Sequence, residues 1–264
     1  MTVADDFLHR GWAQFPADAD TGRWLAASGP VAMARSRNTD LRAAWLRHGG
    51  TWFAGVGVLG ADPDGAVEGG PTLQGAAVSC AKAIYGDVPF DTGQVSVVYP
   101  GYPGRDPGET DAAHRFRRNR DAAHVDGLLP VGPERRRKLQ EPHAFVLGIA
   151  VTEADAGASP LVVWEGSHEV IRKTFAQALH DVPRDAWSET DLTEVYQAAR
   201  RRCFQECPRR ALWALPGQCQ LLHRLVLHGV APWGDGAEAA EEGRAIVYFR
   251  PDFPDAAGDW LNAP

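Results

Sequence analysis

The stretch His124-Val125-Asp126 and the later stretch Leu221-Leu-His-Arg-Leu-Val-Leu-His-Gly229 decide how this sequence is interpreted. Side chains two positions apart on an extended strand project from one face, so His124 and Asp126 are expected to present an imidazole and a carboxylate to the same point. Two neutral histidines and one carboxylate bind three adjacent corners of an octahedral ion and leave three positions open, as in non-haem iron(II) sites that activate dioxygen. The later stretch offers the second imidazole.

His223 and His228 are the two histidines of that later stretch. Because side chains alternate between the faces of a strand, residues five apart cannot both face one metal ion unless the strand bulges between them. One of the two is therefore expected to be a ligand, and the other a hydrogen-bonded core residue or a support for a ligand.

Two further stretches complete an ordered set of motifs. Ser159-Pro-Leu-Val-Val-Trp-Glu-Gly-Ser-His168 lies before the distal histidines, and Gly243-Arg-Ala-Ile-Val-Tyr-Phe-Arg250 follows them. With these motifs, residues 94 to 252 resemble the phytanoyl-CoA dioxygenase family of iron(II)- and 2-oxoglutarate-dependent oxygenases. Its members share an H-x-D, a P-L-x-V-x-P-G-S-H-like strand and turn, a distal H-G and a basic residue shortly afterwards, in this order.

The resemblance implies a role for each matching residue. His124, Asp126 and His228 correspond to the iron ligands, and Arg244 corresponds to the partner of the distal carboxylate of 2-oxoglutarate. Arginine suits that task because its planar guanidinium makes two charge-assisted hydrogen bonds to one carboxylate. The implied fold is mainly β with helical additions (α+β), built on a double-stranded β-helix core of the jelly-roll, cupin-like kind.

The sequence departs from the family pattern in three places. Glu165 replaces the usual proline, Val230 stands where many members have a small polar residue, and residues 231 to 243 lengthen the gap before Arg244. Arg250 is consequently a rival for the cosubstrate, since both arginines share one face of a continuous strand. Arg244 is preferred because it lies nearer the distal histidine and because Arg250 precedes a proline at the expected strand end.

The resemblance implies an enzyme that uses dioxygen and 2-oxoglutarate to oxidise a small-molecule substrate, with release of succinate and carbon dioxide. Asp126 favours hydroxylation or desaturation, because related halogenases have a small residue in its place. Two other classes stay open. One is a zinc- or manganese-dependent hydrolase or isomerase on a cupin-like barrel, in which Arg244 binds substrate. The other is a non-catalytic binding domain in which His124 and Asp126 only form hydrogen bonds.

Size and composition fit one soluble globular domain. Of the 264 residues, 44% are hydrophobic and 23% are charged. We expect a single domain over 1 to 264, with N-terminal helices and supporting strands to 93, a jelly-roll core from 94 to 252, and a helical insertion at about 167 to 207. The formal charge of −7 disfavours a nucleic-acid partner. No secretory signal and no apolar run near the roughly 20 residues of a membrane span is present, so a cytoplasmic location without a membrane partner is expected.

Periodicity and turn residues predict the individual elements. Helices are expected within 1 to 48, at 75 to 85, after Ser167 as a cap, and after a capping box at 191 to 194. Strands are expected at 51 to 59, 94 to 99, 143 to 151, 161 to 164 and 243 to 250, with a hairpin that joins Leu212 to the strand ending at His228. Residues 105 to 119 are expected to form a polar, mobile loop beside the H-x-D strand.

Several residues are candidates for contact with substrate. The aromatic candidates are Tyr99, Tyr102, Trp164 and Trp233, and His143 is expected either to line the pocket or to pack in the core. The basic runs 115 to 120 and 135 to 138 flank the H-x-D strand. They would either hold an anionic group, such as a carboxylate, a phosphate or a coenzyme A ester, or form solvated faces.

Overall fold

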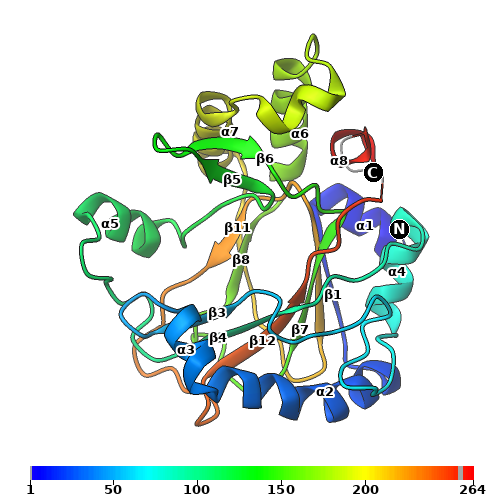
Figure 1. The fold of residues 1–264 in the computed structure, drawn as a ribbon, viewed down its shortest axis with the longest axis vertical. Coiled ribbons are helices and arrows are strands. Elements are labelled where there is room, and N and C mark those ends of the chain that lie inside the picture. Colours follow the sequence, from blue (N-terminus) through cyan, green and yellow to red (C-terminus); the bar gives the residue numbers. More distant parts are fainter. Residues whose placement is uncertain (1, 255–257) are drawn as a thin grey trace.

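The computed structural model describes residues 2 to 254 and 258 to 264, which form antiparallel β-sheets surrounded by helices (Figure 1). The larger sheet has seven strands in the order β1 (Trp12–Phe15), β10 (Cys219–His223), β7 (Phe145–Ala150), β12 (Arg244–Phe249), β4 (Gln94–Val98), β3 (Trp52–Gly55) and β2 (Leu46–Arg47). The smaller sheet has the order β11 (His228–Val230), β8 (Leu161–Trp164) and β9 (Arg209–Leu212), and β5 (Leu128–Val131) pairs with β6 (Arg136–Leu139).

The chain winds between the two main sheets as in a jelly roll. After β4 in the larger sheet, His124 forms an isolated bridge to His228 of the smaller sheet, and the chain then returns to the larger sheet in β7. Strands β8 and β9 lie in the smaller sheet, β10 in the larger, β11 in the smaller and β12 in the larger. This alternation of antiparallel strands confirms the predicted jelly-roll class.

The larger sheet is covered on both faces, which explains the uninterrupted apolar sequence of β7. All six residues of β7 are buried, with Val146 packed against the inner cluster between the sheets and Leu147 in the cluster under the helices. The inner cluster also contains Leu161 of β8 and Leu222 of β10. Side-chain alternation along each strand therefore separates a core between the sheets from a core beneath the helices.

Helices occupy the predicted parts of the chain and two further segments, Asp111–Asn119 and Gly258–Asn262, where no helix was predicted. They are α1 (Val3–Arg10), α2 (Ala19–Arg37), α3 (Thr39–Trp45), α4 (Ala76–Tyr85), α5 (Asp111–Asn119), α6 (Ser167–Ala178), the 3₁₀ helix η1 (Arg184–Glu189), α7 (Thr193–Glu206) and α8 (Gly258–Asn262). Asp18 caps α2 by accepting bonds from the backbone N–H groups of Asp20 and Thr21. In α2 the buried Trp24 packs edge-on against Phe249 of β12, so this helix covers the outer face of the larger sheet (Figure 1).

The segment between β8 and β9 is helical. Helices α6, η1 and α7 lie between β8 and β9, and the predicted stripe of Ile171, Phe175 and Leu179 is buried. The predicted cap at Ser167 is wrong, because the N-cap is Gly166 and the Ser167 hydroxyl accepts a bond from the backbone N–H of Leu227. This hydroxyl stabilises a distant turn instead of its own helix.

Other local predictions are wrong for physical reasons. The polar segment 105 to 119 contains α5, which Thr110 caps. The predicted hairpin at Leu212 is absent, because β9 pairs with β8 while β10 pairs with β1 and β7. The strand predicted at 51 to 59 is β3, which already ends at Gly55. An added Cβ at Gly55 would lie 2.6 Å from side-chain atoms of Phe53 and Val58. The short strand β1 was not expected, since four residues carry little periodicity.

The N-terminal elements are continuous with the core. Strands β1, β2 and β3 join the same sheet as β4, β7, β10 and β12, which supports the single domain over 1 to 264; the division stays a prediction. Within the described ranges, no helix combines the length and the apolar composition required for a transmembrane span.

Candidate metal centre

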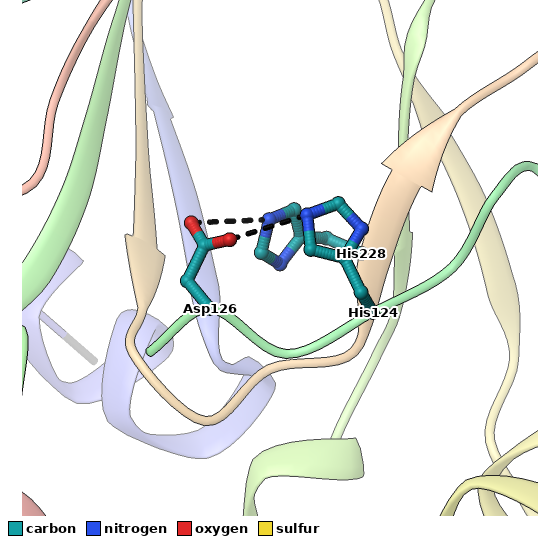
Figure 2. Close-up of side chains that lie close together, drawn as sticks. All are labelled: His124, Asp126 and His228. Carbon is teal, nitrogen blue, oxygen red and sulfur yellow. Dashed lines mark ion pairs between the residues drawn. The ribbon is translucent and has the colours of Figure 1, made fainter. Parts of the chain in front are cut away.

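His124, Asp126 and His228 converge at the edge of the smaller sheet (Figure 2). Nε2 of His124 lies 3.2 Å from Oδ1 of Asp126, and Nε2 of His228 lies 3.6 Å from Oδ2 of Asp126. One ligand atom from each residue falls within 4.8 Å of the others. Ligands at about 2.1 Å from a metal in adjacent octahedral positions are roughly 3 Å apart, so small side-chain shifts would accommodate an ion.

The backbone brings the early pair to the late histidine through a reciprocal bridge. The N–H of His124 donates to the carbonyl of His228 at 2.8 Å, and the N–H of His228 donates to the carbonyl of His124 at 3.0 Å. Asp126 lies in a turn beyond this bridge, so the regular H-x-D strand that the sequence predicts is reduced to one bridge residue. The side chains at i and i+2 still meet because the chain stays extended through the bridge.

Buried contacts hold the segment that precedes His124. Asp121, with φ of 53°, accepts two hydrogen bonds from Arg209 of β9, and its carbonyl accepts from the N–H of Val230. Gly229 permits this approach, since an added Cβ there would lie 2.1 Å from the carbonyl oxygen of Asp121. This close approach explains why the predicted H-G motif has a glycine after His228.

The hydrogen bonds of the two histidines fix which ring nitrogen faces the centre. Nδ1 of His124 donates to the carbonyl of Ala122 at 3.0 Å, and Nδ1 of His228 donates to the carbonyl of Val226 at 3.0 Å. In the neutral ring that binds a metal, the lone pair would be on Nε2, which is the atom directed toward Asp126 (Figure 2). Bonds of this kind orient metal-ligating histidines, so the donor set fits a divalent transition metal.

The electrostatics of the centre keep the carboxylate ionised. Burial would raise the pKa of Asp126, but its interactions with His228, Arg250 and His124 hold that pKa well below its usual value. Burial acts to lower the pKa of His124, and the hydrogen bond to Asp126 outweighs it and raises this pKa. The His124 side chain is half exposed, whereas His228 and Asp126 are buried, so the centre is open on one side.

A cavity of about 480 Å³ adjoins the centre and is large enough for a small organic molecule. Besides the three converging residues, the lining includes the apolar side chains Val146, Leu161 and Leu222 and the tryptophans Trp45 and Trp52. In the larger sheet, Val146 and Leu222 lie on β7 and β10 to one side of β12, and Trp52 lies on β3 to the other side. The cavity therefore combines apolar, aromatic and polar side chains.

The two arginines that compete for the cosubstrate lie in different places. Arg250 lines the cavity, with Nη1 3.7 Å from Oδ2 of Asp126, and it donates to the side-chain carbonyl of Gln94. Arg244 is buried at the other end of β12 and does not line the cavity. Tyr248 lies between them on the strand; it lines the cavity, and its buried hydroxyl has no hydrogen-bond partner among the described residues.

The remaining sequence candidates divide between the cavity wall and the core. Tyr102 lines the cavity, but Tyr99, Trp164 and Trp233 do not. Of the two basic runs, Arg117 alone reaches the lining. His48 and Trp52 also line the cavity, although no sequence motif marks them. Only the pairing of β3 with β4 brings them to the site.

His143 and His223 also lie outside the centre. The ring of His143 forms ion pairs with Asp252 and Glu141 at 2.8 and 3.3 Å and does not line the cavity. Both ring nitrogens of His223 face N–H groups, one of Leu225 and one of Arg172. His223 is therefore a buried core residue. A strand bulge that would turn His223 and His228 toward one metal ion is not required.

Comparisons with known proteins give similar structures but no sequence relatives. No family model matches the chain, and no curated protein matches it. Similar solved structures include the non-haem α-ketoglutarate-dependent carbocyclase SnoK from nogalamycin biosynthesis, with 14% identity, a TM-score of 0.47, and coverage of 97% of this chain and 87% of that one. AviO1 from Streptomyces viridochromogenes Tue57 has 16% identity, a TM-score of 0.47 and coverage of 99% and 96%.

EctD from S. alaskensis with bound Fe has 15% identity, a TM-score of 0.44 and coverage of 94% and 75%. At these identities and TM-scores, the chemistry assigned to this chain depends on its own side chains.

Proposed function

We propose that this protein is an iron(II)- and 2-oxoglutarate-dependent dioxygenase that hydroxylates a small molecule and releases succinate and carbon dioxide. The observation that carries the proposal is the convergence of His124, Asp126 and His228 beside a cavity, with each Nδ1 bonded to a backbone carbonyl and each Nε2 directed toward the Asp126 carboxylate. Two imidazoles, one carboxylate and open positions are the donor set of oxygen-activating iron(II) sites.

The chain's own groups would divide the work of this reaction. His124, Asp126 and His228 would hold iron(II), and that ion would supply the redox chemistry with dioxygen and 2-oxoglutarate. The backbone carbonyls of Ala122 and Val226 keep both imidazoles in the tautomer that binds metal. The apolar side chains that line the cavity, among them Val146 and Leu222, would exclude water and place a substrate C–H bond near the centre.

Arg250 is the proposed partner of the distal carboxylate of 2-oxoglutarate, in place of Arg244, which the sequence favours. Arg250 lines the cavity and lies beside Asp126, and Tyr248 offers an unpartnered hydroxyl two residues away. Arg250→Ala is expected to raise the KM for 2-oxoglutarate by at least about 10-fold through loss of a charge-assisted hydrogen bond. A larger rise for Arg244→Ala, with Arg250→Ala unaffected, would restore the original choice.

Anaerobic addition of iron(II) and 2-oxoglutarate tests the function directly. A weak visible charge-transfer band is expected in the wild-type protein and not in Asp126→Ala, and admission of air is expected to give succinate. A metal-loaded wild-type protein with neither band nor succinate would instead support a metal-dependent hydrolase or isomerase. Binding of a small molecule without any metal would support a non-catalytic binding domain.

A further inference from the structure

Four aromatic side chains that line the cavity, Trp45, His48, Trp52 and Tyr102, form what we call the aromatic wall. Trp52 donates from Nε1 to the Ser96 hydroxyl at 2.9 Å and stacks on His48, with ring centroids 5.3 Å apart and an angle of 15°. Both contacts fix the orientation of the indole. Rigid aromatic faces next to aliphatic side chains favour a planar, apolar ligand.

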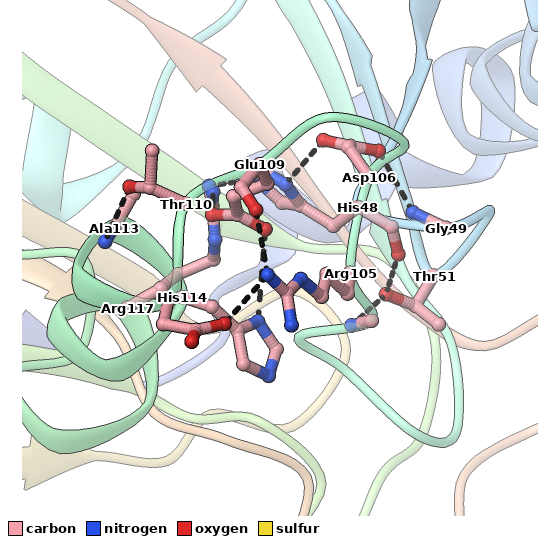
Figure 3. A network of polar contacts seen from close by, with 12 residues as sticks. His48, Gly49, Thr51, Arg105, Asp106, Glu109, Thr110, Ala113, His114 and Arg117 are labelled. Carbon is pink, nitrogen blue, oxygen red and sulfur yellow. Dashed lines mark hydrogen bonds and ion pairs between the residues drawn. The ribbon is translucent and has the colours of Figure 1, made fainter.

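A polar network holds the His48 ring of this wall (Figure 3). Asp106 accepts from the N–H of Gly49 and lies 3.1 Å from Nδ1 of His48, and Arg117 of α5 contacts Nε2 of His48 at 2.7 Å. Glu109 pairs with Arg117. The two carboxylates of the network do not line the cavity, whereas the guanidinium of Arg117 does.

The charged side chains that line the cavity are three arginines, Arg47, Arg117 and Arg250, and one carboxylate, Asp126. Near the metal centre, the positive charges of a divalent ion and Arg250 would balance the negative charges of Asp126 and a dianionic cosubstrate. Arg117 is balanced by Glu109. Arg47 is exposed and stands over Trp45 at 5.8 Å, and within residues 2 to 254 and 258 to 264 no carboxylate forms an ion pair with it. The uncompensated positive charge is therefore at the aromatic wall.

We propose that the substrate is a planar, mainly apolar carboxylic acid whose ring lies against the aromatic wall and whose carboxylate pairs with Arg47. This substrate class rests on the proposed oxygenase function and extends it. A guanidinium binds a carboxylate through two parallel hydrogen bonds, and its contact with an aromatic face keeps it ordered for that purpose. The apolar body then lies in the stretch of cavity that leads to the metal centre.

The test compares acids with their neutral amides on the metal-free protein by isothermal titration calorimetry. The probes are benzoate, trans-cinnamate and 2-naphthoate, each paired with its primary amide. At least one acid is expected to bind roughly 10-fold more tightly than its amide, the factor that one charge-assisted contact provides. Arg47→Gln is expected to remove this preference and leave amide affinity within about twofold. Arg201→Gln, an exposed arginine of α7 outside the cavity, is the matched control and is expected to keep it.

Three outcomes overturn the proposal. In the first, no acid binds more tightly than its amide. In the second, the preference survives Arg47→Gln. In the third, Arg250→Gln removes the preference while Arg47→Gln does not, which would place the acid at the cosubstrate position. Because these titrations need neither iron nor turnover, their failure is distinct from a missing charge-transfer band. Thermal melts of each variant establish that the protein remains folded.

Discussion

Two pairs of buried or half-buried histidines in this molecule look alike and differ in what they can do. The rings of His124 and His228 have centroids 4.7 Å apart, and those of His168 and His223 have centroids 4.8 Å apart. In the first pair, Nδ1 donates to a backbone carbonyl and Nε2 faces the carboxylate of Asp126. In the second pair, both nitrogens of His223 face N–H groups. The capacity to bind metal therefore depends on what each ring nitrogen faces, and proximity alone does not provide it.

Removal of one histidine from each pair gives the largest expected contrast. His228→Ala is expected to weaken iron(II) binding by more than about 100-fold, because a direct ligand is lost, whereas His223→Ala leaves the ligand set intact. Anaerobic competition titration with a chromogenic chelator measures both affinities. Equal losses in the two variants would contradict the distinction between the pairs.

Gly229→Ala tests the steric basis of the approach between His124 and His228. The new Cβ would lie 2.1 Å from the carbonyl oxygen of Asp121, so the segment before His124 must move, at a cost of about 1–3 kcal/mol of unfolding free energy. Gly22→Ala in α2 meets no atom within 4 Å and is the matched control, expected to be neutral or slightly stabilising. Urea denaturation measures both; an unchanged free energy in Gly229→Ala would show that the close approach is not required.

The pair at His223 is expected to make the protein sensitive to acid. Burial, with the nearby charges of Arg224, His168 and Arg172, holds the pKa of His223 well below its ordinary value of 6.5. Below about pH 6.5, His223 binds a proton in the unfolded chain but not in the folded protein. The free energy of unfolding is therefore highest above about pH 6.5 and falls below it. Unfolding free energies measured from pH 7.5 down to 5 are expected to fall less in His223→Gln than in the wild type. Parallel curves would contradict this.

His143 is expected to give a smaller effect of opposite sign. Burial would lower its pKa, but Asp252 and Glu141 raise it from 6.5 to about 9. The ion pairs therefore stabilise the fold fully below about pH 6.5, and this stabilisation is lost as the pH rises through about 9. The loss is on the order of 1 kcal/mol, because both carboxylates are half exposed. The wild type and His143→Gln are expected to converge in unfolding free energy between pH 6.5 and 10, and a constant difference would contradict the assignment.

The sequence predicted the centre better than its surroundings because the centre depends on short spacings. The i, i+2 relation of His124 and Asp126 and the H-G at His228 survive as adjacent side chains even though the regular strand does not. Predictions that depended on pairing were weaker, as the absent hairpin at Leu212 illustrates. Local patterns contain no information on which sheet a strand joins.

Sequence motifs also did not predict which residues line the cavity. Arg244 and Arg250 share one strand face, and only the position of β12 against Asp126 separates them. His48 reaches the site because a turn with φ of 56° is fixed by Asp106 and Arg117, which lie 58 and 69 positions away in the chain. Long-range ion pairs of this kind leave no periodic signal in the sequence.

Anomalous diffraction at the iron edge, from crystals soaked anaerobically in iron(II), tests the central claim most directly. A single strong peak is expected among Nε2 of His124, Nε2 of His228 and the carboxylate of Asp126, and that peak is expected to be absent in His228→Ala. A peak at any other position, or none at the three residues when the crystal contains iron, would contradict the account.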